Sequence, residues 1–148
     1  MYTPGKLIYF DPFYFKDGSE SKPKYFLVLK VINGNVVLAS LPSSKIHLPQ
    51  AQEIIHGCLE MPDSGINCYI FKANTPVTKC GWSFKIDTLL YGNWLDDFNI
   101  ELLSQNYSIE GVDYEIIGEL ADDQFRQLIN CFSTSRVVKR KYKRWLLS

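Results

Sequence analysis

The stretch of sequence that decides the fold, residues 25–41, reads YFLVLKVINGNVVLASL. Two apolar runs, 25–32 and 35–41, flank the dipeptide Asn33-Gly34. Asn-Gly readily adopts the positive φ angles that a two-residue type I′ turn requires. We therefore expect a β-hairpin here, with one antiparallel strand on each side of the turn.

Four further segments have the composition of strands, with many β-branched and aromatic residues. They are residues 5–10, 66–72, 81–86 and 112–118. Stretches that contain proline or glycine interrupt them, which predicts a long loop at 11–24, a polar loop at 42–49 and a turn at 61–65. Two segments stay ambiguous: 51–56 fits one helical turn or an edge strand, and 91–106 fits a helix or an irregular excursion.

A helix is expected late in the chain, over residues 122–132. Its first turn holds Asp122 and Asp123, where the exposed amides and the helix dipole favour negative charge. Apolar side chains recur at the spacing of one helix face, at Phe125, Leu128, Ile129 and Phe132. Many short strands with one late helix predict a mainly β, α+β fold, namely a small β-barrel capped by a C-terminal helix.

The composition is that of an ordinary globular domain: 148 residues, of which 46% are hydrophobic and 22% charged. We expect one domain over 1–148, with a basic C-terminal segment at 133–148. No apolar run approaches the ~18 residues of a membrane span, and the first residues lack the apolar core of a signal peptide. A cytoplasmic protein without a membrane partner is therefore expected.

The four cysteines, Cys58, Cys68, Cys80 and Cys131, show neither a CxxC pair nor zinc-ligand spacing. We expect reduced and mostly buried thiols. The two histidines, His47 and His56, form no HxxxH pattern and are expected to be surface or satisfied core residues. Glycine-rich phosphate loops and the GxSxG motif are also absent from the sequence, so no metal and no cofactor is expected.

Charge is divided into blocks, although 16 basic and 16 acidic residues balance. Residues 86–125 hold ten acidic residues and no lysine or arginine, whereas residues 126–148 hold seven basic residues and no acidic one. Such asymmetry can mark an anion-binding face, or the blocks can neutralise each other within the fold or across a dimer. The basic segment has the same two interpretations: it binds phosphate backbones, or it docks onto the acidic block with 145–147 filling an apolar groove.

Two polar loops lead into and out of the hairpin. Because a hairpin brings its outer ends together, residues 18–24 and 41–45 should be neighbours. They would gather hydroxyl and ammonium groups that suit a phosphate, from Ser19, Ser43, Ser44, Lys22, Lys24 and Lys45. The alternative is a solvated polar rim, which any small barrel has.

These residues also carry a resemblance to the MazF/PemK (Kid) family of toxin–antitoxin endoribonucleases. The resemblance covers roughly residues 5–45 and 112–132, whereas 50–110 are longer and less similar. The matching pieces are the opening strand Gly5–Pro12, the loop Gly18-Ser19-Glu20, the apolar strand Leu27–Leu29, the strand and serine-rich exit Val36–Lys45, and the helix entry Ile117–Phe125.

The resemblance implies an SH3-like β-barrel, a homodimer, and inhibition by an acidic antitoxin peptide. It also implies metal-independent cleavage of single-stranded RNA, in which a ribose 2′-OH attacks the adjacent phosphate. The sequence departs from the family where the family's arginine aligns with Lys24 and its proline with Tyr25. The family's catalytic threonine falls near Pro42 or Ser43. Lysine keeps the charge of arginine but loses its planar bidentate fork.

On this resemblance, Lys24 would stabilise the developing phosphate charge, and Ser43 and Ser19 would position the phosphate. Lys22, Ser44, Lys45 and Tyr14 would bind the RNA, although Tyr14 and its two phenylalanine neighbours can equally pack under their loop. The alternative function is a catalytically degenerate barrel that acts as a nucleic-acid- or protein-binding module. A third interpretation is an unrelated small barrel whose loop pattern matches by chance.

Overall fold

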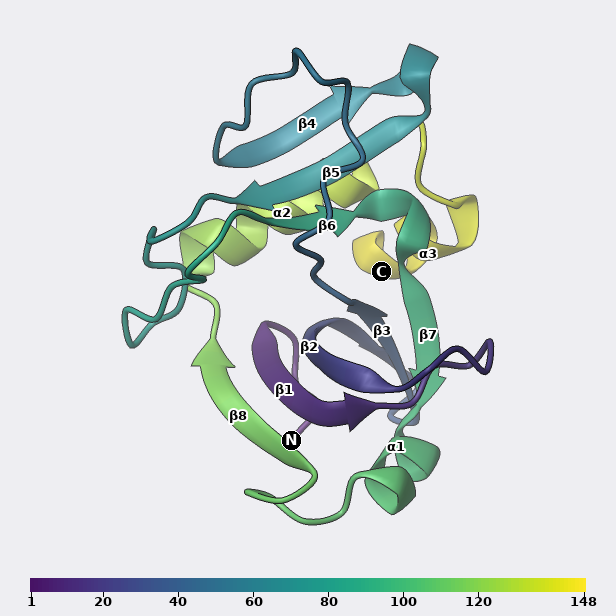
Figure 1. Cartoon of the computed structure of the whole chain (residues 1–148). Helices are drawn as coiled ribbons and strands as arrows, with labels where there is room; N and C mark the ends of the chain where they lie inside the picture. The colour runs from purple at the N-terminus through teal and green to yellow at the C-terminus, as the bar shows by residue number, and fades with distance from the viewer.

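The computed structural model describes all residues 1–148, which form eight strands, two short 3-10 helices and three α-helices (Figure 1). The strands are β1 (Lys6–Phe13), β2 (Lys22–Ile32), β3 (Val36–Ser40), β4 (Gly57–Met61), β5 (Ile66–Phe71), β6 (Thr88–Tyr91), β7 (Asp96–Asn99) and β8 (Tyr114–Glu119). The helices are η1 (Pro62–Ser64), η2 (Gly92–Trp94), α1 (Ile100–Asn106), α2 (Asp122–Ser133) and α3 (Arg140–Leu147).

The hairpin at the centre of the sequence forms as expected. β2 and β3 pair antiparallel, with Ile32 opposite Val36 next to the turn. Asn33 and Gly34 have φ angles of 54° and 74°, the left-handed conformation of both central residues in a type I′ turn. The local sequence therefore sets the turn. The strand register differs from that of a two-residue hairpin, because Asn35 also lies in the loop and the register shifts between Val28 and Lys30.

The hairpin lies at the middle of a five-stranded antiparallel sheet, the larger sheet, with the strand order β7-β3-β2-β1-β8. A smaller sheet has the order β4-β5-β6 and lies at the other end of the molecule in Figure 1. The fold is therefore mainly β with three α-helices, as the α+β prediction stated. The larger sheet does not close into a barrel, because β7 and β8 remain its two edges.

Both faces of the larger sheet are buried, which explains why β2 is a continuous apolar run rather than an alternating one. Successive side chains of a strand point to opposite faces. Leu27 and Leu29 therefore join a core cluster with α2, α3 and the smaller sheet, whereas Phe26 and Val28 join a second cluster. That second cluster also contains Phe98 of β7.

Several segments differ from the sequence predictions or resolve their ambiguity. The predicted loop 11–24 is shorter, because β1 runs to Phe13 and β2 begins at Lys22, and β4 was not predicted. Residues 81–86 were expected to be a strand but form none; the neighbouring strand is β6 instead. Loop hydrogen bonds hold the segment, since the Trp82 amide donates to the Thr78 hydroxyl at 2.9 Å and the Phe84 carbonyl accepts from Asn74. Residues 51–56 form neither a helical turn nor an edge strand. The ambiguous region 91–106 contains η2, β7 and α1.

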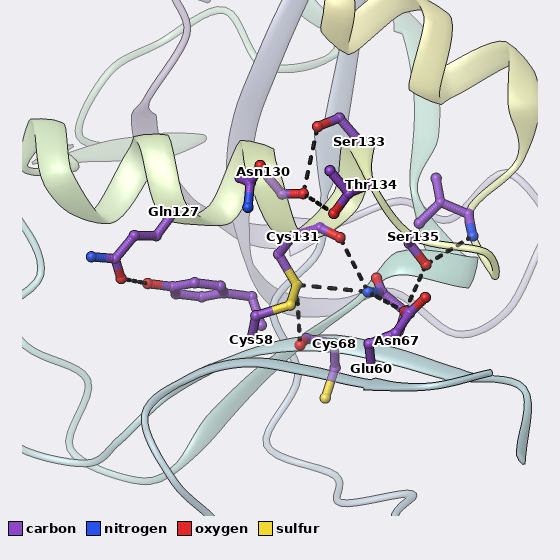
Figure 2. The surroundings of a disulfide bond; sticks show 12 residues. Cys58, Glu60, Asn67, Cys68, Gln127, Asn130, Cys131, Ser133, Thr134 and Ser135 are labelled. Carbon is purple, nitrogen blue, oxygen red and sulfur yellow. Dashed lines mark hydrogen bonds between the residues drawn. A yellow bond between two sulfur atoms is a disulfide. The ribbon is translucent and has the colours of Figure 1, made fainter. Parts of the chain in front are cut away.

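A disulfide joins Cys58 of β4 to Cys131 of α2, with the two Cα atoms 5.6 Å apart (Figure 2). The prediction of reduced thiols is therefore wrong for these two residues, because the fold brings together positions 73 residues apart. Cys68 is free and buried, and Cys80 is free and exposed. Disulfides persist mainly in oxidising compartments, so the cytoplasmic location stays a prediction.

The basic C-terminal segment docks onto the rest of the fold through α3. Tyr142 and Leu146 are buried, and the Lys141 ammonium lies 3.9 Å from an Asp97 carboxylate oxygen. Leu147 is 72% exposed, so the apolar docking predicted for residues 145–147 holds for only part of that run. No helix in the structure combines the length and apolar character needed to cross a membrane.

Candidate functional site

The two loops that flank the hairpin meet, as the sequence predicts. Between them lies a pocket of about 800 Å³, the rim pocket. Its lining includes five of the residues singled out from the sequence: Ser19, Lys22, Lys24, Ser43 and Lys45. The pairing of β1 with β2 brings the first loop to this edge, since Phe13 pairs with Lys22. The pairing of β2 with β3 brings the second loop to the same edge.

Lys24 links the two loops directly. Its ammonium group donates a 3.1 Å hydrogen bond to the carbonyl oxygen of Pro42. Burial lowers the pKa of Lys24, and the neighbouring charges of Lys22 and Lys45 lower it further. Of the five ion pairs in the structure, none includes any of these three lysines. The pocket therefore concentrates positive charge that the protein itself leaves uncompensated by direct ion pairs.

The two predicted serines are held more tightly than the sequence implied. Ser43 is buried, and its backbone pairs with Leu89 of β6 in both directions, at 2.9 and 2.8 Å. Its hydroxyl accepts a 3.1 Å hydrogen bond from the Lys45 amide, which fixes the loop that carries Lys45. The Ser19 hydroxyl donates to the carboxylate of Asp17. Both hydroxyls thus have partners within their own loops.

Negative charge also reaches the rim pocket, through Asp17 and Glu20. The hydroxyl and amide of Ser19 both donate to Asp17 and lower the pKa of its carboxyl group. Asp17 is therefore ionised at neutral pH, and its two hydrogen bonds from Ser19 order the first loop. The three lysines of the pocket outnumber its two carboxylates, so their summed formal charge is positive.

His47 and Trp94 also line the rim pocket, and the sequence analysis gave neither a functional role. The His47 ring lies edge-on to Trp94, with centroids 5.3 Å apart. The His47 amide donates to the Tyr91 hydroxyl at 2.8 Å, and that hydroxyl donates to the Lys45 carbonyl at 2.5 Å. No local pattern marks either residue, because 44 positions separate His47 from Tyr91 in the sequence.

Two of the predicted RNA-binding residues lie outside the rim pocket. Ser44 lines a neighbouring hollow, although that hollow shares Lys24 with the pocket. Tyr14 is 59% exposed, and its ring stacks against Tyr107 with centroids 6.0 Å apart. Phe13 is buried beneath it, so part of this aromatic run does pack under the loop.

The residue types of the rim pocket suit anion binding and proton transfer. Three ammonium groups can hold a phosphate through charge-assisted hydrogen bonds. An imidazole such as that of His47 can act as a general acid or base. The structure contains no group of three or more histidine, cysteine, aspartate or glutamate side chains placed to hold a metal ion.

Comparisons of the chain with family models, curated proteins and solved structures found no match.

Proposed function

We propose that the rim pocket binds single-stranded RNA and holds a backbone phosphate among Lys22, Lys24 and Lys45. The observation that carries this proposal is the position of the Lys24 ammonium. It is half-buried, its charge is opposed by two neighbouring lysines, and no carboxylate pairs with it. A bound phosphate would relieve that repulsion, because an opposite charge favours the protonated lysine.

The aromatic rings beside the lysines favour a single strand over a duplex. Trp94 is 52% exposed and lines the pocket with Phe15. Unstacked bases can lie on such rings, whereas bases in a duplex are already stacked on each other. A strand that places its phosphate among the lysines would leave a base within reach of Trp94.

Cleavage of the bound RNA is a second candidate function, favoured by His47 at the edge of the same pocket. In this reaction the 2′-oxygen attacks the adjacent phosphorus while its proton passes to a base. The bond to the 5′-oxygen breaks, that oxygen receives a proton from an acid, and a 2′,3′-cyclic phosphate remains. In this proposal His47 would act as the base or the acid, and Lys24 would stabilise the phosphorane charge. Ser43 and Ser19 would position the two loops.

The resemblance to the MazF/PemK family supports the same reaction and its independence of metal. The curved strands β1 and β2 (Figure 1) are of the kind an SH3-like sheet needs, and we propose that relationship for the larger sheet. The family also implies a homodimer and an acidic antitoxin peptide, which would compete with RNA for the three lysines. Without cleavage, the chain would be a nucleic-acid-binding module.

The test measures binding of a fluorescent single-stranded RNA in EDTA at several salt concentrations. We expect affinity to fall steeply with salt, and Lys24→Ala to weaken binding about 10-fold, as for the loss of one charge-assisted contact. Lys6→Ala is the matched control, since Lys6 is also half-buried but lies at the opposite end of β1. Equal affinities of wild type and Lys24→Ala would refute the proposal.

Gel analysis of the same mixtures separates binding from cleavage. If the protein cleaves, a 2′,3′-cyclic phosphate product accumulates in EDTA and His47→Ala slows its formation while leaving RNA bound. If RNA binds but no product forms over a long incubation, the nuclease function is ruled out and the chain acts as a binding module.

A further inference from the structure

A second hollow adjoins the rim pocket at Lys24. It has a volume of about 460 Å³, and Lys24 lines both it and the rim pocket. Its walls come from β1, β2 and the segment before β6, and Ser44 borders it on the exit loop of the hairpin. We call it the aromatic hollow, because it is lined by Tyr9, Tyr25, Trp82 and Phe84.

The rings of the aromatic hollow pack against neighbouring rings and are partly exposed. Tyr9 and Tyr25 face each other across β1 and β2, with centroids 5.0 Å apart. Trp82 lies 5.6 Å from Tyr25 and packs edge-on against the buried Phe84 at 4.7 Å. Tyr9, Tyr25 and Trp82 are only half-buried. Packing thus fixes these rings while part of their surface stays accessible to a ligand.

Charge distinguishes this hollow from an ordinary aromatic patch. Its only charged lining residues are Lys24 and Lys85, and no acidic residue lines it. Lys85 is exposed and takes part in no ion pair. Two carboxylates lie near its lining residues. Asp87, between the lining residues Ile86 and Thr88 in the sequence, pairs with Lys72 at 3.2 Å. Glu115 pairs with Tyr9 across β1 and β8 and, after burial and Tyr9, contributes to raising the pKa of Tyr25. Glu115 therefore limits the cationic surface on that side.

We propose that the aromatic hollow binds the base of a nucleotide adjacent to the phosphate in the rim pocket, so that a single strand of RNA passes over Lys24. The inference rests on the proposed function, since it extends the same strand. Lys24 and Lys85 both line the hollow and can pair with the phosphates on either side of a bound base, and Trp82 gives that base a ring to stack on. An acidic peptide would use the two lysines but would have no need of the aromatic rings.

The experiment uses a short single-stranded oligoribonucleotide and a set of strands in which each position in turn lacks its base. The aromatic hollow predicts that one abasic position costs wild type about 5- to 100-fold in affinity. Trp82→Leu should bind the complete strand more weakly by a similar factor. Removing the base at the sensitive position should then cause no further loss of affinity in this variant. Trp145→Leu is the control, because Trp145 is also half-buried and packs on a tyrosine, 5.5 Å away in α3.

A second variant guards against misfolding of Trp82→Leu. Lys85→Ala changes an exposed side chain and should make the salt dependence shallower. The slope of log affinity against log salt should become less negative by roughly 0.7, the value for one phosphate contact of a single strand. Lys139→Ala, another exposed lysine, should leave the slope unchanged.

The outcomes distinguish this inference from the proposed function. Failure of wild type to bind the complete strand overturns both. Binding that depends on Lys24 but is unchanged in Trp82→Leu and Lys85→Ala overturns only the aromatic hollow. The inference is also overturned if wild type and Trp82→Leu lose the same affinity at every abasic position. It is overturned as well if an acidic peptide binds more tightly than RNA and Trp82→Leu weakens that peptide binding.

Discussion

The phenol of Tyr142 donates a 2.6 Å hydrogen bond to the Oδ1 atom of Asp97, which ties the basic helix α3 to the edge strand β7. The two residues come from the oppositely charged blocks of the sequence. Of the two interpretations of the basic segment, the contact favours docking within the fold. It does so through one carboxylate rather than through general neutralisation, because Asp97 is the only acidic residue paired with α3.

Removal of this hydroxyl should weaken the docking of α3. We expect Tyr142→Phe to lower the free energy of unfolding by about 1.5–3 kcal/mol, as for a hydrogen bond to a charged acceptor. Urea denaturation at neutral pH measures the change. Tyr14→Phe is the control, since the Tyr14 hydroxyl makes no hydrogen bond in the structure. Identical unfolding curves for wild type and Tyr142→Phe would contradict the role of the bond.

The same pair predicts a pH dependence. Burial, and next the hydrogen bond to Asp97, raise the pKa of Tyr142 well above its ordinary value of 10.0. The unfolded chain therefore loses this proton at a lower pH than the folded chain does. The contribution of Tyr142 is complete below pH 10.0 and is lost as the pH rises through the raised pKa. The difference in unfolding free energy between wild type and Tyr142→Phe should therefore become smaller above pH 10.0. A difference that stays constant with pH would be evidence against this coupling.

The disulfide should stabilise the attachment of the smaller sheet to α2. It closes a loop across a sequence separation of 73, for which loop entropy gives about 4 kcal/mol. Cys58→Ser should lower the free energy of unfolding by roughly this amount, measured by urea denaturation without reductant. Cys80→Ser, which replaces an exposed free thiol, should unfold like wild type. The expectation fails if reduction of wild type leaves its unfolding midpoint unchanged.

Gly92 has no room for a side chain. A methyl group there would lie 2.0 Å from the Oδ1 atom of Asn67 and 2.7 Å from Val138. Asn67 cannot move easily, because it is fully buried and donates to Glu60 and to the Cys131 carbonyl (Figure 2). We expect Gly92→Ala to cost about 3 kcal/mol in unfolding free energy. Gly118→Ala, whose nearest contacts would be 3.4 to 3.5 Å, should cost less than about 1 kcal/mol.

Lys24→Arg tests the charge of the rim pocket. The pKa of Lys24 is lowered by burial and by Lys22 and Lys45, so Lys24 loses its charge below the ordinary lysine value of 10.5. RNA affinity of wild type should therefore fall as the pH rises through the lowered pKa, whereas arginine stays charged and preserves it. If the protein cleaves RNA, arginine should also raise the rate about 10-fold or more. Lys6→Arg should reproduce the pH profile of wild type, and an unchanged profile in Lys24→Arg would count against the charge argument.

The elements that the sequence predicts well are those specified by neighbouring residues. Asn33 and Gly34 set their own turn through their φ angles. α2 follows from an apolar stripe with Leu128 and Phe132 buried. By contrast, β7 has the sequence Asp-Asp-Phe-Asn, in which every residue except the phenylalanine disfavours a strand. It becomes a strand because it pairs with β3 and because its Phe98 packs into the core.

The candidate site divides in the same way. Lys24 and Ser43 could be placed together from the sequence, because a hairpin determines which residues lie beyond its two ends. His47 and Trp94 could not, because their segments meet through tertiary packing, in which both rings contact Tyr91 and each other. The cysteine pairing is also hidden, since a disulfide framework cannot be deduced from sequence alone.

By itself, then, the sequence determined the hairpin, the late helix and the meeting of two cationic loops, since these depend on backbone preference and on periodicity over a few residues. Only the tertiary structure decided the open sheet, the disulfide between Cys58 and Cys131, and the rings that complete the two hollows beside Lys24. Those features join segments that are distant in the chain, and their partners are chosen by the burial of side chains in a shared core.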